Sequence, residues 1–273
     1  MRTVRVHIGD DAIEYEIAAE TAFGADEVLL ERDDDLLAGT EFADNGFTVA
    51  PFLPAAAHAA LVDGVQRLLV AAITQVAPRV SEADFTLAGY HRAVTDAEHA
   101  ALVETTGVHW PNEALPIPMA LVERRVSEIL GVDVVATNPS FDLHHFQVRV
   151  VRPGKPDNNP PHRDVWLDRL RNAVNVYVPL AGSNASSSLP LVPGSHRWRE
   201  AEIERTVSGA TIDGVRYTVP AVTDVRGGWR MVRPPVGPNQ VMVFTPYAIH
   251  GGGVNRNADL TRVSLEIRFW RRR

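Results

Sequence analysis

The residues with the clearest potential for chemistry are His162 and Asp164, one residue apart, and His250, which lies further along the chain. In extended backbone, side chains two residues apart point to the same face, so His162 and Asp164 can reach one point in space. If His250 joins them from another strand, two imidazoles and one carboxylate lie on one side of a metal ion. That ligand set suits a non-haem Fe(II) centre with open positions for substrate and oxygen.

Each of these residues also has a plainer interpretation. His162 and Asp164 follow the proline-rich, turn-forming segment 155–161, and could be a histidine at a strand edge with a solvated aspartate. His250 follows an apolar strand and could be a histidine in a turn. It precedes the three glycines 251–253, where small residues leave room for a ligand beside the imidazole. The pattern of all three residues together, more than any one of them, favours the metal.

Arg262 lies twelve positions after His250, and Ser264 follows on the same face of the expected strand. A guanidinium offers a planar fork that matches a carboxylate, and a neighbouring hydroxyl can donate another hydrogen bond. This pair would hold the far carboxylate of a dicarboxylate cosubstrate whose other end chelates the metal. For Arg262 alone, the alternative is a salt bridge to a neighbour such as Glu266.

The elements that must position these residues change in type along the chain. The first half is rich in helical periodicity, including a start at Ser81 and Asp84 that resembles a capping box. After Gly131 the pattern alternates as in strands, with Gly, Pro, Asn and Ser in the joints. We expect helices at 54–76, 81–90, 95–104 and 118–130, and strands at 3–7, 13–17, 47–49, 141–151, 172–180, 240–245 and 262–270.

These elements predict a single domain, because no repeat, low-complexity tract or linker divides residues 1–273. On the metal-site hypothesis it is an oxygenase domain. The fold class is mainly β with flanking helices (α+β), with a double-stranded β-helix core of the cupin-like jelly-roll type. Within it we expect an appended hairpin at 1–40, a helix-rich support at 41–135 and the jelly-roll core with the metal site at 136–273.

Composition excludes several classes of protein. The net charge of -7 and the pI near 5.8 do not favour nucleic-acid binding. The N-terminus lacks the apolar core of a signal peptide, and no apolar run approaches a membrane span. The absence of cysteine excludes a disulfide scaffold, a thiolate zinc site and a cysteine nucleophile. We therefore expect a cytoplasmic protein with a small-molecule substrate and no nucleic-acid or membrane partner; the sequence leaves the oligomeric state open.

With these motifs, the chain resembles a known family, the phytanoyl-CoA dioxygenase family of Fe(II)- and 2-oxoglutarate-dependent oxygenases. The resemblance spans about residues 40 to 270. The Pro-Gly-Ser-His element beside a His-X-Asp motif is its most distinctive part. Four pieces carry it: Asn45-Gly46-Phe47 leading into Phe52-Leu53, His162-Arg163-Asp164, Leu189 to His196, and His250 with Arg262 and Ser264.

The resemblance implies that His162, Asp164 and His250 bind Fe(II), and that Arg262 with Ser264 binds 2-oxoglutarate, with O2 as the oxidant. The family also places polar residues on the strands before and after the His-X-Asp motif. The matching candidates here are Gln147 and Asn175.

The resemblance also bears on the reaction. Related halogenases carry a small residue at the carboxylate position, so Asp164 favours hydroxylation or another oxidation. The chain departs from the family in one respect: the stretch before the His-X-Asp motif has one lysine and no clear basic cluster to bind coenzyme A. We therefore expect oxidation of a polar small molecule, such as a secondary metabolite, sugar or nucleotide derivative, with release of succinate and CO2. Side chains around the barrel mouth that could contact substrate, or equally serve packing, are Arg163, Trp166, Trp198, Trp229 and Tyr247.

Three rival interpretations of the same residues make different predictions. The His-Arg-Asp triplet matches a protein-kinase catalytic loop, but Arg169 stands where an Asn is required and no Gly-rich loop opens the chain. A cupin-like metalloenzyme would use the same jelly roll without 2-oxoglutarate, and predicts that Arg262 and Ser264 are dispensable. A non-catalytic jelly-roll module that binds small ligands predicts neither iron binding nor succinate production.

Overall fold

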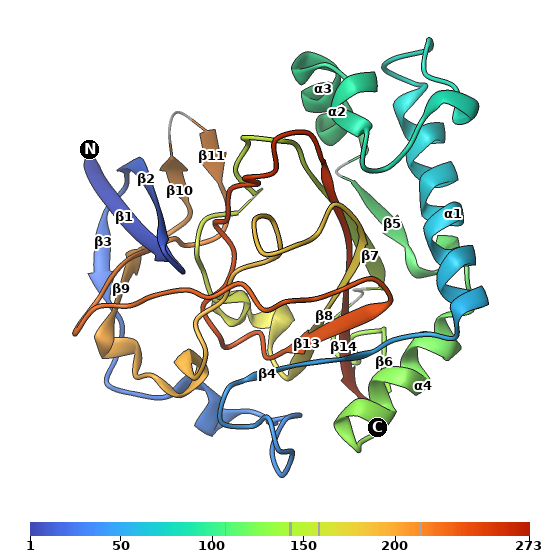
Figure 1. Cartoon of the computed structure of the whole chain (residues 1–273). Helices are drawn as coiled ribbons and strands as arrows, with labels where there is room; N and C mark the ends of the chain where they lie inside the picture. The colour runs from blue at the N-terminus through green and yellow to red at the C-terminus, as the bar shows by residue number, and fades with distance from the viewer. Residues whose placement is uncertain (107, 142–143, 158, 213–214) are drawn as a thin grey trace.

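The computed structural model describes residues 1–273 except 107, 142–143, 158 and 213–214. The largest sheet runs through the middle of the molecule, with the helices on one side and the N-terminal strands on the other (Figure 1). Its pairs are antiparallel. Its strands, in spatial order, are β4 (Phe47–Pro51), β13 (Gln240–Phe244), β8 (Ala173–Ala181), β14 (Arg262–Arg271), β7 (His145–Val151) and β5 (His109–Pro111), with β6 (Val134–Val135) paired to β14.

Two smaller sheets include the N-terminal strands. The first two strands form a hairpin in which Ile8 pairs with Asp11, and Gly9 in the turn has a φ of 58°. Val4 and Val6 are buried in a cluster with Ile249, which precedes the candidate ligand His250. One sheet contains β1 (Arg2–Ile8), β2 (Asp11–Ala18), β10 (Ala210–Ile212) and β11 (Val215–Tyr217), and the other contains β12 (Val222–Val225), β9 (Ile203–Thr206) and β3 (Thr21–Phe23).

Alternation along β14 divides the large sheet into an apolar face and a polar face. The odd-numbered residues from 263 to 269 are buried in the main hydrophobic core. The even-numbered residues from 262 to 268 are Arg, Ser, Glu and Arg, and a period of two places them on the opposite face. The neighbouring strands follow the same rule: Phe146, Val148 and Val150 of β7 and Val174, Val176 and Val178 of β8 belong to the main core.

In the part of the chain that the structure describes, four α-helices flank the sheet: α1 (Ala55–Ile73), α2 (Tyr90–Ala93), α3 (Asp96–Thr106) and α4 (Met119–Leu130). Figure 1 shows them gathered on the side of β5 and β7. By length and composition alone α1 could cross a membrane, but Leu61, Val65 and Leu69 are fully buried in the main core. Gly64 permits close packing of α1, because an added Cβ would lie 2.1 Å from the Pro116 Cβ.

The predicted helix at 81–90 is wrong. A short 3-10 turn, Glu82–Asp84, is followed by extended backbone at Phe85. Ser81 donates its hydroxyl hydrogen bond to the Asp84 side chain at 2.7 Å, so it does not cap the backbone. The same sequence pattern succeeds before α3, where Thr95 and Glu98 satisfy each other's backbone N–H groups. Glu98 has one more methylene than Asp84 and can reach back to the first residue.

The mainly β fold with flanking helices is confirmed. The predicted strand at 141–151 begins at His145, and residues 142 and 143 of that range lie outside the described residues. The other strands of the second half end within two residues of their predicted limits. Facing the large sheet, residues 156, 162, 191, 232, 250 and 254 contribute isolated bridges in place of long strands. The metal-site histidines belong to these bridges.

Candidate metal centre

A single antiparallel bridge holds the two candidate histidines opposite each other. The backbone N–H of His162 donates to the His250 carbonyl at 2.9 Å, and the reverse hydrogen bond measures 3.0 Å. Their ring centroids are 4.5 Å apart. Arg163 is extended, with φ of -108° and ψ of 131°, so the flanking side chains of His162 and Asp164 converge as expected from their spacing. Asp164 then begins a 3-10 turn rather than continuing a strand.

Hydrogen bonds to the backbone determine where each imidazole carries its proton. His162 Nδ1 donates to the Pro160 carbonyl at 2.7 Å, and His250 Nδ1 donates to the Ala248 carbonyl at 3.0 Å. Because a carbonyl oxygen only accepts, the neutral rings are protonated at Nδ1. Each Nε2 therefore presents a lone pair, which is the state required of a metal ligand.

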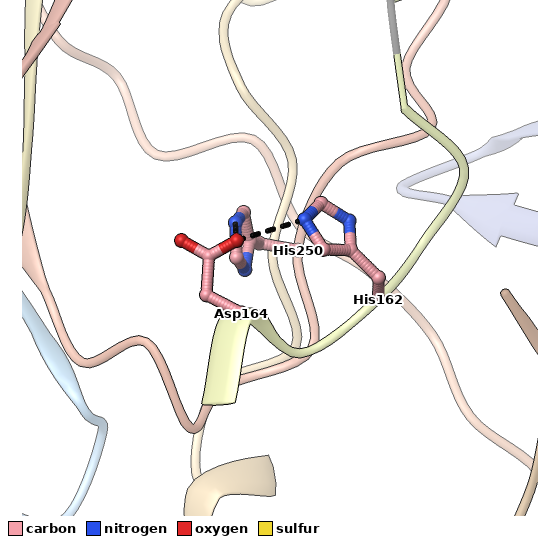
Figure 2. Close-up of side chains that lie close together, drawn as sticks. All are labelled: His162, Asp164 and His250. Carbon is pink, nitrogen blue, oxygen red and sulfur yellow. Dashed lines mark hydrogen bonds and ion pairs between the residues drawn. The ribbon is translucent and has the colours of Figure 1, made fainter. Parts of the chain in front are cut away.

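The Nε2 atom of each ring lies beside the Asp164 carboxylate, and dashed lines mark both contacts in Figure 2. Asp164 Oδ1 lies 3.0 Å from His162 Nε2 and 3.9 Å from His250 Nε2. The other oxygen, Oδ2, accepts a hydrogen bond from Asn175 Nδ2 at 2.9 Å. It also accepts two from Arg268, at 3.2 Å from Nε and 3.0 Å from Nη2. The two carboxylate oxygens therefore have different surroundings.

The protonation of this group follows from burial and charge. Burial, followed by the neighbouring His162, lowers the pKa of His250 to about 4, so its ring is neutral at pH 7. Burial alone would raise the pKa of Asp164, but the charge of Arg268 brings it well below its ordinary value. The group therefore combines an ionised carboxylate with neutral imidazole.

The three side chains fit a divalent metal ion. Their ligand atoms lie within 4.8 Å of one another, and all three residues are buried. Two nitrogen lone pairs directed at a carboxylate oxygen repel it unless a cation lies between them. A set of two imidazoles and one carboxylate is the facial arrangement that suits Fe(II) and leaves further positions open.

The glycines after His250 serve a different purpose from the one expected. Gly251 and Gly252 have φ values of 92° and 72°, a conformation that L side chains rarely adopt. A Cβ on Gly252 would lie 2.3 Å from Pro161 Cδ, and one on Gly251 would lie 3.2 Å from His162 Nδ1. The segment that carries His162 thus occupies the space where side chains at these two positions would lie. This close approach brings the two histidines together.

The Pro-Gly-Ser-His element supports His250 from behind. Ser195 Oγ donates to the Val192 carbonyl at 2.7 Å and accepts from the Ile249 backbone N–H at 2.8 Å. Leu191 forms an antiparallel bridge with His250. This element therefore positions His250 through the Ser195 hydroxyl and the backbone of Leu191.

A small cavity lies beside the three residues. Its wall includes Asn175, which was predicted, and several charged residues that were not. Glu266 and Arg268 follow Ser264 at the same two-residue spacing, so the alternation of β14 could have identified them. On β7, Arg149 follows the predicted residue Gln147 by two positions, so strand alternation could have identified it as well. No sequence pattern predicts that Asp157 or Asn159 lines the cavity. The charged and amide residues of the wall are Arg149, Asp157, Asn159, Asp164, Asn175, Glu266 and Arg268.

The four predicted cosubstrate residues share one property. Among the described residues, no hydrogen-bond partner is found for Arg262 Nε, Ser264 Oγ, Gln147 Oε1 or Asn175 Oδ1, although all four atoms are buried. Leaving a buried polar atom unpaired costs about 1–3 kcal/mol, so such atoms mark places where a ligand can bind. Of the four residues, only Asn175 lines the cavity directly, while Gln147 Nε2 contacts His109.

Arg262 already has a carboxylate partner within the protein. Its Nη2 donates to Asp157 Oδ2 at 2.7 Å, and Glu266 pairs with Arg149 at 3.0 Å rather than with Arg262. Burial lowers the pKa of nearby Arg233 to about 10, with a further contribution from the charge of Arg262. Arg149, Arg233 and Arg262 all interact with the charge of Asp157.

The structure places the five expected substrate contacts elsewhere. None of these described residues lines the cavity beside the metal site. Arg163 is 1% exposed and bonds to Glu200 and to the Ser195 carbonyl. Tyr247 is buried with Val165. Trp166 donates to Glu200 and lies under Arg205, while Trp198 and Trp229 pack against the cluster that contains Ile249.

Comparisons with known proteins give a family and a fold. A sequence profile of the phytanoyl-CoA dioxygenase family matches residues 42–264. The crystal structure of AviO1 from Streptomyces viridochromogenes Tue57 is similar, with a TM-score of 0.53 and 20% identity over 86% of this chain and 95% of that one. EctD from S. alaskensis with 2-oxoglutarate and 5-hydroxyectoine has a TM-score of 0.50 and 14% identity, over 94% of this chain and 86% of that one. A comparison with curated proteins gave no match.

Proposed function

The chain belongs to the phytanoyl-CoA dioxygenase family of non-haem iron, 2-oxoglutarate-dependent oxygenases, and on that premise we propose which residues perform its reaction and on what class of substrate. His162, Asp164 and His250 hold the iron. The observation that carries this assignment is the pair of Nδ1–H groups bonded to backbone carbonyls, which direct both Nε2 lone pairs at Asp164 Oδ1. Bound Fe(II) supplies the redox chemistry that couples O2 to oxidation of an unreactive C–H bond.

Arg262 and Ser264 bind the distal carboxylate of 2-oxoglutarate. Arg262 Nε and Ser264 Oγ are buried donors without partners in the described structure. A guanidinium that keeps Nε–H free beside an occupied Nη2 can still form a charge-assisted hydrogen bond.

The reaction then consumes 2-oxoglutarate, O2 and a substrate C–H bond. One oxygen atom enters succinate, the other enters the substrate, and CO2 is released.

The substrate is a polar small molecule. Seven of the residues around the cavity carry charged or amide side chains, including Arg268 and Asn159, whereas Leu189, Phe244 and Ile267 supply apolar surface. An oxidisable hydrocarbon group needs apolar contact, and the polar wall favours a molecule that carries hydroxyl, carbonyl or charged groups beside it. Sugars, nucleotides and hydroxylated secondary metabolites have this character.

Anaerobic titration with Fe(II) and 2-oxoglutarate tests the site assignment. The wild-type protein should develop the weak visible charge-transfer band of the 2-oxoglutarate chelate, and His162→Ala and His250→Ala should each abolish it. His7→Ala, which alters a histidine in β1, is the matched control and should retain the band. A band that persists without either proposed histidine would contradict the ligand assignment, and its absence from the wild type would contradict cosubstrate binding.

Succinate release tests the substrate class. Production should rise above the substrate-free level for members of a panel of sugars, nucleotides and amino acids, but not for acyl thioesters, because the stretch before the His-X-Asp motif has no clear basic cluster to bind coenzyme A. Product mass should increase by one oxygen atom if the outcome is hydroxylation. Stimulation confined to long-chain acyl thioesters would overturn the polar assignment.

A further inference from the structure

Arg268 contacts the Asp164 carboxylate in an asymmetric way. In a fork-to-fork pair, a guanidinium gives one N–H to each carboxylate oxygen. Here Nε and Nη2 both donate to Oδ2, at 3.2 and 3.0 Å, and Asn175 Nδ2 adds a third donor at 2.9 Å. Oδ1 has neither Arg268 nor Asn175 as a partner and faces the imidazole nitrogens at 3.0 and 3.9 Å.

The sheet determines this asymmetry. Arg268 of β14 pairs in register with Asn175 of β8, so the two side chains leave adjacent strands on the same face. Asp164 is 2% exposed, and its backbone N–H is bonded to the Pro246 carbonyl at 3.0 Å. Turning the carboxylate so that both of its oxygens face the imidazoles would break three hydrogen bonds in a buried site. Charge-assisted hydrogen bonds contribute about 1.5–3 kcal/mol each, so such a rotation is strongly disfavoured.

We propose that Arg268, assisted by Asn175, is a positioning residue that holds Asp164 so that only Oδ1 can bind the metal. This inference rests on the proposed iron site and adds a role that the His-X-Asp motif does not contain. A carboxylate that binds through both oxygens would occupy one more coordination position. With two imidazoles and a chelating 2-oxo acid also bound, no position would remain for O2. Arg268 thereby preserves the open position on which the reaction depends.

The position of Arg268 agrees with this role. Its side chain is 17% exposed and lines the cavity, so it is not a residue of the apolar core. In the described structure, it is the only Arg or Lys in an ion pair with Asp164. Hydrogen-bonded partners of metal ligands typically change metal affinity by about 10- to 100-fold when they are removed.

The test uses Co(II) and Fe(II) binding to the full chain under anaerobic conditions, without substrate. Arg268→Met should weaken metal binding by about 10- to 100-fold. It should also change the visible absorption of bound Co(II), whose intensity reports coordination number. Arg268→Lys keeps the charge but cannot place two donors on one oxygen, and should give an intermediate affinity. Asn175→Ala should produce a smaller loss than Arg268→Met.

Arg171→Met is the matched control. Arg171 also directs Nε and Nη2 to one oxygen of a partly buried carboxylate, that of Asp33, at 2.9 and 2.5 Å, but away from the metal site. It should lose stability while its metal affinity stays within about 2-fold of wild type. Wild-type affinity and an unchanged Co(II) spectrum in folded Arg268→Met and Arg268→Lys would overturn this inference. Failure of the wild-type protein to bind either metal would instead overturn the proposed iron site.

Discussion

Arg262 donates to Asp157 at 2.7 Å although the two residues are 105 positions apart, and this internal pair lies where the distal carboxylate of the cosubstrate is proposed to bind. Burial alone would lower the pKa of Arg262, but the charge of Asp157 raises it above its ordinary value. The cation is therefore stabilised before any ligand arrives. Asp157 and 2-oxoglutarate then compete in part for one guanidinium.

Asp157→Asn should tighten the binding of 2-oxoglutarate. The substitution keeps a hydrogen-bond acceptor for Arg262 but removes the competing negative charge. We expect the dissociation constant to fall about 3- to 10-fold, or about 1 kcal/mol, in anaerobic titrations. The apoprotein should also melt at a lower temperature, because a buried arginine loses its counter-ion.

Asp11→Asn is the control for Asp157→Asn, since Asp11 forms a half-exposed pair with Arg256 at 2.8 Å. It should change neither property measurably, as expected for a surface ion pair. Weaker cosubstrate binding by Asp157→Asn would show instead that Asp157 holds Arg262 in its binding position.

Ser264→Ala should separate binding from stability. The Ser264 hydroxyl is fully buried and has no hydrogen-bond partner within the described structure, so removing it should leave the melting temperature unchanged or slightly higher. The KM for 2-oxoglutarate should nevertheless rise about 5- to 10-fold through loss of one donor to a carboxylate. The contrasting variant is Ser195→Ala, whose hydroxyl makes two hydrogen bonds and whose loss should cost about 1–2 kcal/mol of stability. An unchanged KM in Ser264→Ala would remove Ser264 from the cosubstrate site.

Gly252→Ala should damage the metal site through the backbone. The new methyl group would lie 2.3 Å from Pro161 and would sit on backbone with a φ of 72°. We expect a loss of about 1–3 kcal/mol in the free energy of unfolding, together with weaker metal binding as His162 and His250 separate. Gly227→Ala has a comparable φ of 84° with no atom within 4 Å of the added Cβ. It should lose stability from strain alone and bind metal normally; equal metal affinity in the two variants would contradict the packing argument.

The metal-free protein should lose stability as the pH falls from about 6.5 to 4. Burial lowers the pKa of His99 to about 4, and its Nδ1 lies 2.9 Å from the Tyr90 hydroxyl. Unfolded chains have a histidine pKa near 6.5, so between these values the unfolded state binds more protons and acid favours it. Below pH 4 both states are protonated and this contribution levels off. Melting temperatures of wild type and His99→Gln across this range should show a shallower slope for the variant; identical slopes would exclude His99 as a source.

Short-range spacing was sufficient for part of the site. His162 and Asp164 converge because one extended residue separates them, and this geometry follows from their spacing alone. The alternation of β14 likewise places Arg262 and Ser264 on one face. Continued for four more residues, the same alternation would have reached Glu266 and Arg268. Helix capping was less dependable, because the Ser81 and Thr95 patterns look alike and only the longer Glu98 side chain closes its box.

Contacts between distant segments were decided only by tertiary structure. The sequence by itself determined the ligand types, the mainly β class and the order of the motifs, because these depend on local periodicity and composition. It could not tell that Arg163 turns away to Glu200, that Asp157 pairs with Arg262, or that Arg268 takes one oxygen of Asp164. Each of those contacts joins segments separated by more than thirty residues, and which carboxylate a guanidinium meets depends on strand register and burial in the folded protein.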